Sequence, residues 1–214
     1  MDYILNITWF ILQGSLTTVE LFFITAVLAT PLGFLVAMGE ISKFKPLSKL
    51  LYLYTWIFRG TPLMLQIFFV YYGLPTFGIK FDSFTAASLA MVINYAAYLA
   101  EIFRAGMQSI DIGQIEASRA LGMTYGQMMR HIILPQTIKR VLPPVSNEFI
   151  SLIKDTALVS VIGMGDLLRA AKQVVTRDFN ITAFIIAAVL YLLMTSVVVA
   201  AFRRLEARYS VYDG

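Results

Sequence analysis

The sequence predicts an all-α membrane protein with five transmembrane helices and a structured cytoplasmic loop. Of its 214 residues, 58% are hydrophobic and only 14% are charged, whereas a soluble domain carries about 25% charged residues. Five apolar stretches are long enough to cross a bilayer, which takes about 20 residues of helix. Basic side chains collect in the connections on one side of these stretches. Together, these observations predict a helical bundle with lipid as its solvent.

The predicted spans differ in what precedes them. They cover residues 15–38, 62–79, 84–103, 141–162 and 181–202. The apolar segment 3–12, with Trp9, extends the first span or lies along the membrane interface. Segment 47–58 is too short to cross, and its flanking lysines indicate a helix leading into the second span. Thr61 and Pro62 are predicted to be the N-cap and the first residue of that second span.

The distribution of basic residues predicts the orientation of the chain. The first-to-second connection, the third-to-fourth connection and the C-terminal tail hold 12 of the 17 Lys and Arg residues. Four lie on the other side, and Lys154 lies inside the fourth span. Since Lys and Arg are enriched in cytoplasmic loops, we expect the N-terminus outside and the C-terminus in the cytoplasm. The chain has no cysteine and one histidine, which argues against any metal site.

Polar side chains in the fourth span are candidates for substrate binding. Glu148 and Asp155 are seven residues apart and share one helix face. Ser151 lies on the same side, and Thr156 is adjacent in sequence. Charge inside a membrane is costly and is a functional hypothesis by default. The rival interpretation is that Glu148 and Lys154 belong to structural pairs that hold the bundle together.

The third span repeats this pattern. Asn94, Tyr98 and Glu101 have i, i+4, i+7 spacing and form a polar stripe on a helix rich in Ala and Leu. In the second span, Gln66 is the corresponding polar candidate. As an alternative role, Glu101 and Arg104 form a simple ion pair near the cytoplasmic face. These residues complete the predicted polar lining.

The third-to-fourth connection, residues 104–140, is too long for a simple turn and has clear helix punctuation. Loops of this length in compact proteins usually have a function. Gly122 is suited to end a first short helix as its C′ residue. Thr124 and Gln127 have the spacing of a capping box at the start of a second helix, and Pro135 is predicted to end it. The loop is therefore predicted to be a cytoplasmic helix pair.

This loop resembles the EAA loop of ABC-importer permeases. The family pattern is Glu-Ala-Ala, a Gly after three residues, nine residues, and Ile-x-Leu-Pro. The matching positions are Glu116, Ala117, Ser118, Gly122, Ile132, Leu134 and Pro135. Ser118 replaces the second Ala, a small-for-small departure. Segments 59–62, 71–75, 98–104 and 154–160 also resemble the polar amino-acid branch of that family.

The resemblance implies a type I ABC-importer-like fold and a division of labour between subunits. In this family the EAA loop docks into a groove on the ATPase and transmits its closure to the spans. We expect residues 1–214 to form a single transmembrane permease domain. Its partners are two ATP-binding cassette ATPase subunits, a second permease subunit that is identical or similar, and an extracytoplasmic amino-acid-binding protein. Segment 163–180 is one candidate contact for the binding protein.

The absence of a G-x-x-x-x-G-K-[ST] phosphate loop fits this division, because the chain then depends on a separate ATPase. We therefore expect no enzyme activity, cofactor or nucleic-acid partner for this chain, with ATP and Mg²⁺ on the ATPase. The expected location is the bacterial inner membrane, as a multi-pass protein in contact with lipid.

The predicted function is import of polar amino acids, with a weak preference for cationic ones because acids outnumber Lys154 in the spans. The main alternative is an ion-coupled secondary amino-acid transporter, in which the intramembrane carboxylates relay protons or bind sodium. A channel and an export or lipid-handling permease are less favoured, because an EAA loop is unexpected in either.

Overall fold

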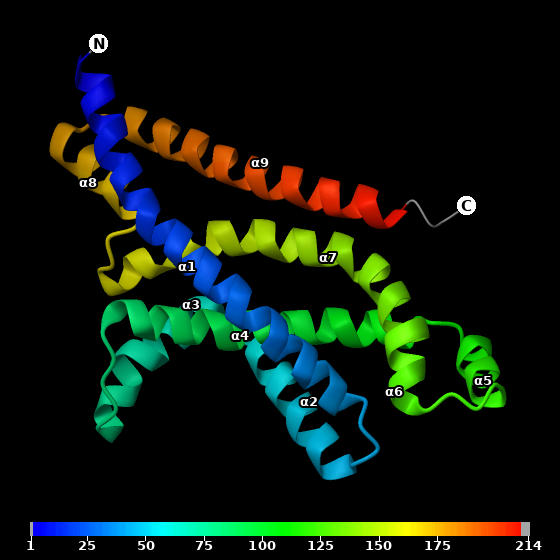
Figure 1. The fold of residues 1–214 in the computed structure, drawn as a ribbon. Coiled ribbons are helices and arrows are strands. Elements are labelled where there is room, and N and C mark those ends of the chain that lie inside the picture. Colours follow the sequence, from blue (N-terminus) through cyan, green and yellow to red (C-terminus); the bar gives the residue numbers. More distant parts are fainter. Residues whose placement is uncertain (1, 211–214) are drawn as a thin grey trace.

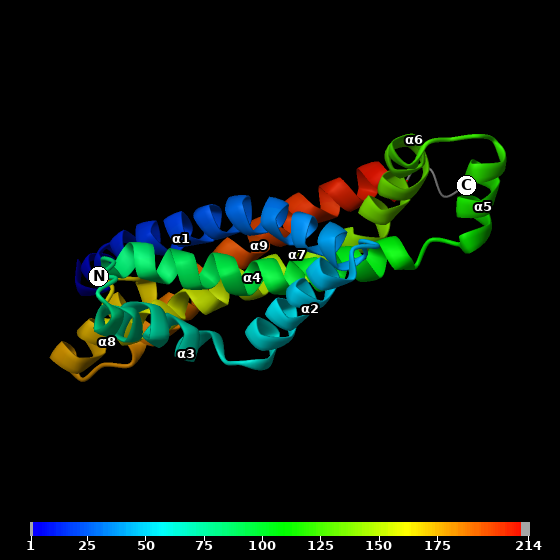
Figure 2. The same ribbon diagram turned by 90° about the horizontal axis from the view of Figure 1, so that it is seen from below.

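The computed structural model describes residues 2–210, and every regular element within them is a helix (Figures 1 and 2). The elements are α1 (Asp2–Glu40), α2 (Lys45–Gly60), α3 (Leu63–Phe68), the π-helix η1 (Phe69–Gly73), the 3₁₀-helix η2 (Leu74–Phe77), α4 (Ser83–Gln108), α5 (Ile112–Ala120), α6 (Tyr125–Met128), the π-helix η3 (Met129–Ile133), α7 (Leu134–Asp155), the 3₁₀-helix η4 (Thr156–Ile162), α8 (Leu167–Asp178) and α9 (Thr182–Ser210). The predicted all-α class is confirmed.

Three helices in the described part of the chain are long and apolar enough to cross a membrane: α1, α4 and α9. The second predicted span corresponds to a shorter apolar helix, Leu63–Phe77, which at 1.5 Å per residue reaches about 22 Å of the roughly 30 Å hydrocarbon core. The fourth predicted span lies within α7 and η4, and this pair also turns from α-helix to 3₁₀-helix at Thr156. The count of five spans therefore stays a prediction.

The helices are longer than the predicted spans at several ends. The segment 3–12 is continuous with the first span in α1. The α4 helix continues to Gln108, and α7 begins at Leu134. The connection between these two helices is therefore shorter than the predicted loop of residues 104–140, and most of it is helical. Figure 1 shows α5 and α6 at the end of the bundle where α4 and α9 end, away from the N-terminus.

The prediction that Pro135 ends a helix is wrong. The helix that begins at Tyr125 continues through η3 into α7 without a break. Proline lacks the N–H that an interior helical position donates, but Pro135 follows the wide turn of η3 and lies in the first turn of α7. Across this turn the Leu134 N–H donates five residues back, to the Met129 carbonyl, so the bonding pattern shifts at the position where Pro135 has no N–H to donate and the helix continues past it.

The predicted turn between α5 and α6 is confirmed. Gly122 has a left-handed backbone with φ of +72°. Its N–H donates to the carbonyl of Arg119, and the N–H of Met123 donates to that of Ser118, which is the Schellman arrangement. Thr124 then caps α6 in a reciprocal capping box with Gln127.

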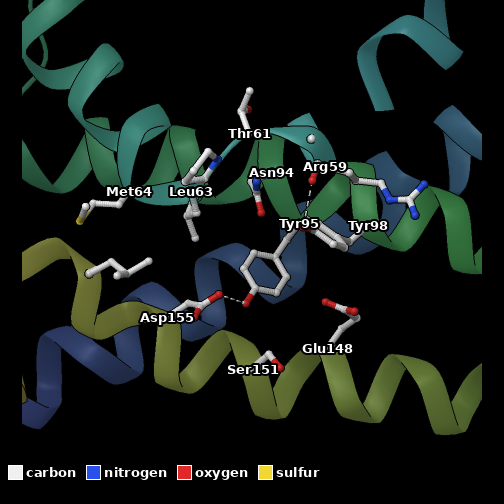
Figure 3. A pocket seen from close by; sticks show the side chains of 13 residues that line it. Arg59, Thr61, Leu63, Met64, Asn94, Tyr95, Tyr98, Glu148, Ser151 and Asp155 are labelled. Atoms are coloured by element: carbon white, nitrogen blue, oxygen red, sulfur yellow. Dashed lines mark hydrogen bonds between the residues drawn. The ribbon is translucent and has the colours of Figure 1, made fainter. Parts of the chain in front are cut away.

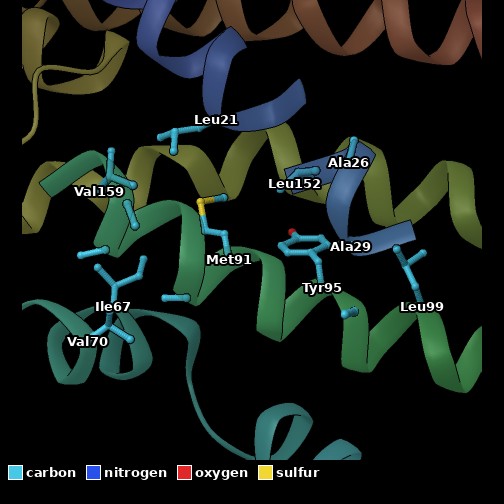
Figure 4. Packing of buried hydrophobic residues seen from close by; sticks show 14 of the residues in the cluster. Leu21, Ala26, Ala29, Ile67, Val70, Met91, Tyr95, Leu99, Leu152 and Val159 are labelled. Atoms are coloured by element: carbon cyan, nitrogen blue, oxygen red, sulfur yellow. The ribbon is translucent and has the colours of Figure 1, made fainter. Parts of the chain in front are cut away.

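Close packing of α1 against α4 forms the centre of the bundle (Figure 4). Leu21 and Ala29 of α1 are fully buried, as are Met91 of α4 and Leu152 of α7. The buried residues of α4 include six alanines, Ala86, Ala87, Ala90, Ala96, Ala97 and Ala100. Small side chains let helices approach closely within a membrane, and here they allow α1 to cross α4 at short range.

At the opposite end from α5, a polar contact fastens the start of α1 to α8. The Tyr3 hydroxyl donates a hydrogen bond to Asp178 Oδ2 at 2.7 Å, and Arg177 Nε donates to Oδ1 at 2.6 Å. These bonds, that from Arg177 above all, lower the pKa of Asp178 to about 2. The Asp178 carboxylate therefore stays charged over the physiological pH range, and its hydrogen bond with Tyr3 joins the start of α1 to the end of α8.

Gly33 of α1 provides a test of the α1–α4 packing. A Cβ there would lie 2.9 Å from the carbonyl oxygen of Ala96 and 2.9 Å from Leu99 Cβ. Because overpacking typically costs about 1–3 kcal/mol, we expect Gly33→Ala to lower the melting temperature of the purified protein. Gly165→Ala is the control, since a Cβ there meets no atom within 4 Å. Equal melting temperatures for the two variants would contradict this packing.

Candidate functional site

A cavity of about 650 Å³, lined by charged and polar as well as apolar side chains, lies between the α2–α3 junction, α4 and α7 (Figure 3). Its lining residues are Arg59, Gly60, Thr61, Pro62, Leu63, Met64, Asn94, Tyr95, Tyr98, Glu148, Ser151, Asp155 and Leu158. Small-molecule sites typically have volumes of about 300–1,000 Å³, so the cavity is large enough for an amino acid. The polar residues of α4 line one wall of the cavity, and those of α7 line the opposite wall.

The cavity brings together five of the eight predicted substrate contacts. These are Asn94, Tyr98, Glu148, Ser151 and Asp155. The other three, Gln66, Glu101 and Thr156, are not among its lining residues. Thr156 is fully buried and donates its hydroxyl to the carbonyl of Ile153, so its hydroxyl is satisfied within its own turn.

The two acids of α7 differ in their partners. Asp155 Oδ2 accepts a hydrogen bond from the Tyr95 hydroxyl at 2.8 Å, across the cavity from α4 (Figure 3). Within residues 2–210, Glu148 has no hydrogen bond or ion pair, and no ion pair joins it to the exposed Lys154. Sequence reasoning missed Tyr95, although its place three residues before Tyr98 puts it on the adjoining part of the same helix face.

Gln66 and Asn94 fasten the break between α2 and α3. Gln66 Nε2 donates to the carbonyl of Phe58 at 2.9 Å and to Thr61 Oγ1 at 2.8 Å. Asn94 Nδ2 donates to the same carbonyl of Phe58 at 2.9 Å and to Gln66 Oε1 at 3.0 Å. Both side chains are buried. Gln66 thus supports the wall of the cavity from behind, through the backbone of the junction.

The predicted N-cap role of Thr61 is wrong. Thr61 is the C-cap of α2, and Pro62 holds the N-cap position of α3 without a side-chain cap bond. The Thr61 hydroxyl donates back to the carbonyl of Ile57 at 2.9 Å and accepts from Gln66. A hydroxyl already engaged with the preceding helix cannot turn to cap the next one.

A balanced ion network lies beside the cavity. Arg104 pairs with Glu101 and, through Nε, with Glu40 Oε2 at 3.2 Å. Arg59 Nη1 pairs with Glu101 Oε2 at 3.0 Å, and Thr55 donates to Glu40 Oε1 at 2.6 Å. The predicted pair of Glu101 and Arg104 is therefore present, within a larger cluster. Two acids and two bases from α1, α2 and α4 compensate one another.

The residues that match the EAA pattern are distributed over α5, the turn at Gly122, η3 and the start of α7. Glu116 and Ala117 are exposed, whereas Ser118 is buried and donates to the carbonyl of Gln114. Three large apolar side chains beside them, Ile112, Leu121 and Tyr125, are 60–81% exposed. Exposed apolar surface of this kind is typical of a contact with another protein.

Comparison with known proteins identifies the class of protein. Residues 29–211 match the family described as binding-protein-dependent transport system inner membrane component. The chain is 42% identical to the arginine transport system permease protein ArtQ of Bacillus subtilis (strain 168), over 92% of this chain and 93% of that one. It is 36% identical to a glutamine transport system permease protein, GlnP, of Rickettsia bellii (strain RML369-C), over 94% of each.

A solved structure described as an amino acid ABC transporter with histidines is 38% identical, covers 96% of this chain and 97% of its own, and has a TM-score of 0.89. The chain therefore belongs to the binding-protein-dependent transport system inner membrane component family. It is a permease subunit of an ABC importer in the bacterial inner membrane, and ATP hydrolysis is the task of a partner ATPase.

The junction that Gln66 supports can be tested by Gln66→Met. The variant keeps the side-chain length but removes the Gln66 donor to Phe58 and Thr61, and it removes one of the two acceptors of the Asn94 amide. Since each buried group left unsatisfied costs about 1–3 kcal/mol, we expect a clearly lower melting temperature. Gln173→Met, at an exposed position of α8, is the matched control. An unchanged melting temperature for Gln66→Met would show that the hydrogen bonds of Gln66 do not stabilise the α2–α3 junction.

Proposed function

We propose that this chain forms the translocation path of an ATP-driven importer for polar amino acids and that it favours cationic ones. The observation that carries the proposal is the pair of acids, Glu148 and Asp155, in the cavity of a binding-protein-dependent permease. The named relatives include permeases for arginine and for glutamine, which supports an amino acid as the substrate class.

Charge is the argument for a cationic substrate. Every amino acid has an ammonium group for one carboxylate, and arginine, lysine or protonated histidine has a second positive charge for the other. A carboxylate without a partner in a membrane is costly, and Glu148 has no ion pair within the described residues. A bound dibasic ligand removes that cost at both acids, whereas a neutral amino acid leaves one uncompensated.

The assembly that we propose has two permease subunits, two ATPase subunits and an extracytoplasmic binding protein. The second permease subunit is either a second copy of this chain, which is the simplest case, or a similar chain that forms a heterodimer with it. Closure of the ATPases moves the α5–α6 region and rocks the helices around the cavity, which is alternating access. The exposed apolar group around Leu121 supports this region as the ATPase contact.

The proposed topology has the whole chain as one transmembrane domain with five crossings. The shorter helix Leu63–Phe77 and the α7–η4 pair complete the set begun by α1, α4 and α9. The 12 basic residues among 17 that lie in the connections on the side of α5 and in the C-terminal tail support a cytoplasmic C-terminus and an external N-terminus.

The coupling role of the loop is tested with two glycines. A Cβ at Gly122 or Gly126 meets no atom within 4 Å, but only Gly122 has a left-handed backbone. An L-residue there costs about 1–2 kcal/mol. We expect Gly122→Ala to reduce ATP hydrolysis stimulated by arginine-loaded binding protein at least fivefold, roughly the factor that 1 kcal/mol gives, in proteoliposomes containing the partner ATPase. Gly126→Ala should stay near the native rate.

Equal stimulation in both glycine variants would contradict a coupling role for the α5–α6 turn. Uptake that follows a proton or sodium gradient and continues without ATP hydrolysis would instead establish the ion-coupled alternative.

The substrate role of Asp155 is tested by Asp155→Asn in the assembled transporter. Loss of a charge-assisted hydrogen bond should weaken arginine binding by about 10- to 100-fold, with an unchanged melting temperature. Asp82→Asn is the control, because Asp82 caps α4 outside the cavity and Asn caps helices equally well. Unchanged affinity in Asp155→Asn, or a loss of affinity that only follows a loss of folded protein, would count against contact.

A further inference from the structure

We propose that Arg59 binds the α-carboxylate of the substrate, so that the cavity holds an amino acid in one orientation. The inference rests on the proposed function, because it concerns the same cavity. The two acids provide for the positive groups of a ligand and leave its negative group without a partner. Among the described residues that line the cavity, Arg59 is the one basic side chain.

The position of Arg59 is fixed from two sides. It is next to last in α2, and its guanidinium carbon lies 5.8 Å from the centre of the Tyr98 ring, within the range of a cation–π contact. The Tyr98 hydroxyl donates to the Arg59 carbonyl at 3.3 Å. Figure 3 shows the guanidinium beside Tyr98, at the end of the cavity where Glu148 lies. A preplaced cation loses little freedom when an anion binds.

Arg59 keeps free donors for a ligand. Its one ion pair within residues 2–210 is that of Nη1 with Glu101, whereas a guanidinium has five N–H donors in a planar fork suited to carboxylates. The side chain remains 37% exposed. Glu101 is also paired with Arg104, so it retains a countercharge while Arg59 binds the ligand.

The charges of the cavity then match those of a dibasic amino acid group by group. Glu148 and Asp155 supply two negative charges from α7, and Arg59 supplies one positive charge from the end of α2. The ligand has two positive groups and one negative group. A ligand without the carboxylate, such as agmatine, keeps both positive groups but makes no ion pair with Arg59, which then retains only Glu101. Arg59 would therefore separate amino acids from amines of the same shape.

The experiment compares L-arginine with agmatine as ligands of the assembled transporter in nanodiscs, without binding protein. In the native complex we expect arginine to bind about 10- to 100-fold more tightly than agmatine, the factor of one charge-assisted contact. Arg59→Gln should bring the ratio close to one by weakening arginine alone. Arg59→Lys should restore part of it, because lysine keeps the charge without the planar fork.

Arg140→Gln is the matched control. It removes a guanidinium of α7 that lies outside the cavity lining and outside the ion network of Glu40 and Glu101, so the native preference for arginine should persist. If Arg59→Gln weakens arginine and agmatine equally, Arg59 is structural and the inference is overturned. If Asp155→Asn leaves arginine affinity unchanged, the cavity is not the substrate site and the proposed function fails first.

Discussion

The cavity depends on how the chain breaks its helix between α2 and α3. A break frees backbone carbonyls, and in a membrane each one must find a partner within the protein. Gln66 and Asn94 meet this requirement by donating to the carbonyl of Phe58, and Gln66 also donates to that of Thr61. Because the break is satisfied from behind, its other side, including Pro62, is free to line the cavity.

Charge within the bundle is arranged in two different ways. The network of Glu40, Arg59, Glu101 and Arg104 is neutral as a whole, so it joins α1, α2 and α4 without requiring a ligand. The acids of α7 carry negative charge that no base in the described chain pairs within 4 Å. Arg59 belongs to both groups, since it pairs with Glu101 and also lines the cavity.

Features set by neighbouring residues could be predicted from the sequence. The turn at Gly122 and the capping box of Thr124 depend on a few positions, and helix periodicity was enough to place Glu148 and Asp155 on one face. The role of Gln66 at the α2–α3 junction could not be predicted, because it depends on which backbone carbonyls the break at Thr61-Pro62 leaves without a partner in the helix. Pro135 was misjudged because a π-turn precedes it, and this turn has no signature in the local sequence. Tyr95 and Arg59 gain their roles only when α4, α2 and α7 come together.

The continuity of the helix after Thr124 has a mechanical consequence. Helical structure runs from Tyr125 to Asp155 without interruption, which at 1.5 Å per residue is about 45 Å measured along the helix. This helix is not straight: Figure 1 shows that it bends between α6 and α7. The π-segment η3 lies in this stretch, and Pro143 and Pro144 lie inside α7, where a proline removes a helical hydrogen bond and kinks the helix. Ile132, Leu134 and Pro135 of the EAA pattern lie near its start, and Glu148 and Asp155 lie near its end. A movement imposed near α6 therefore reaches the acids through one continuous but bent helix, and the bend sets the direction in which they move.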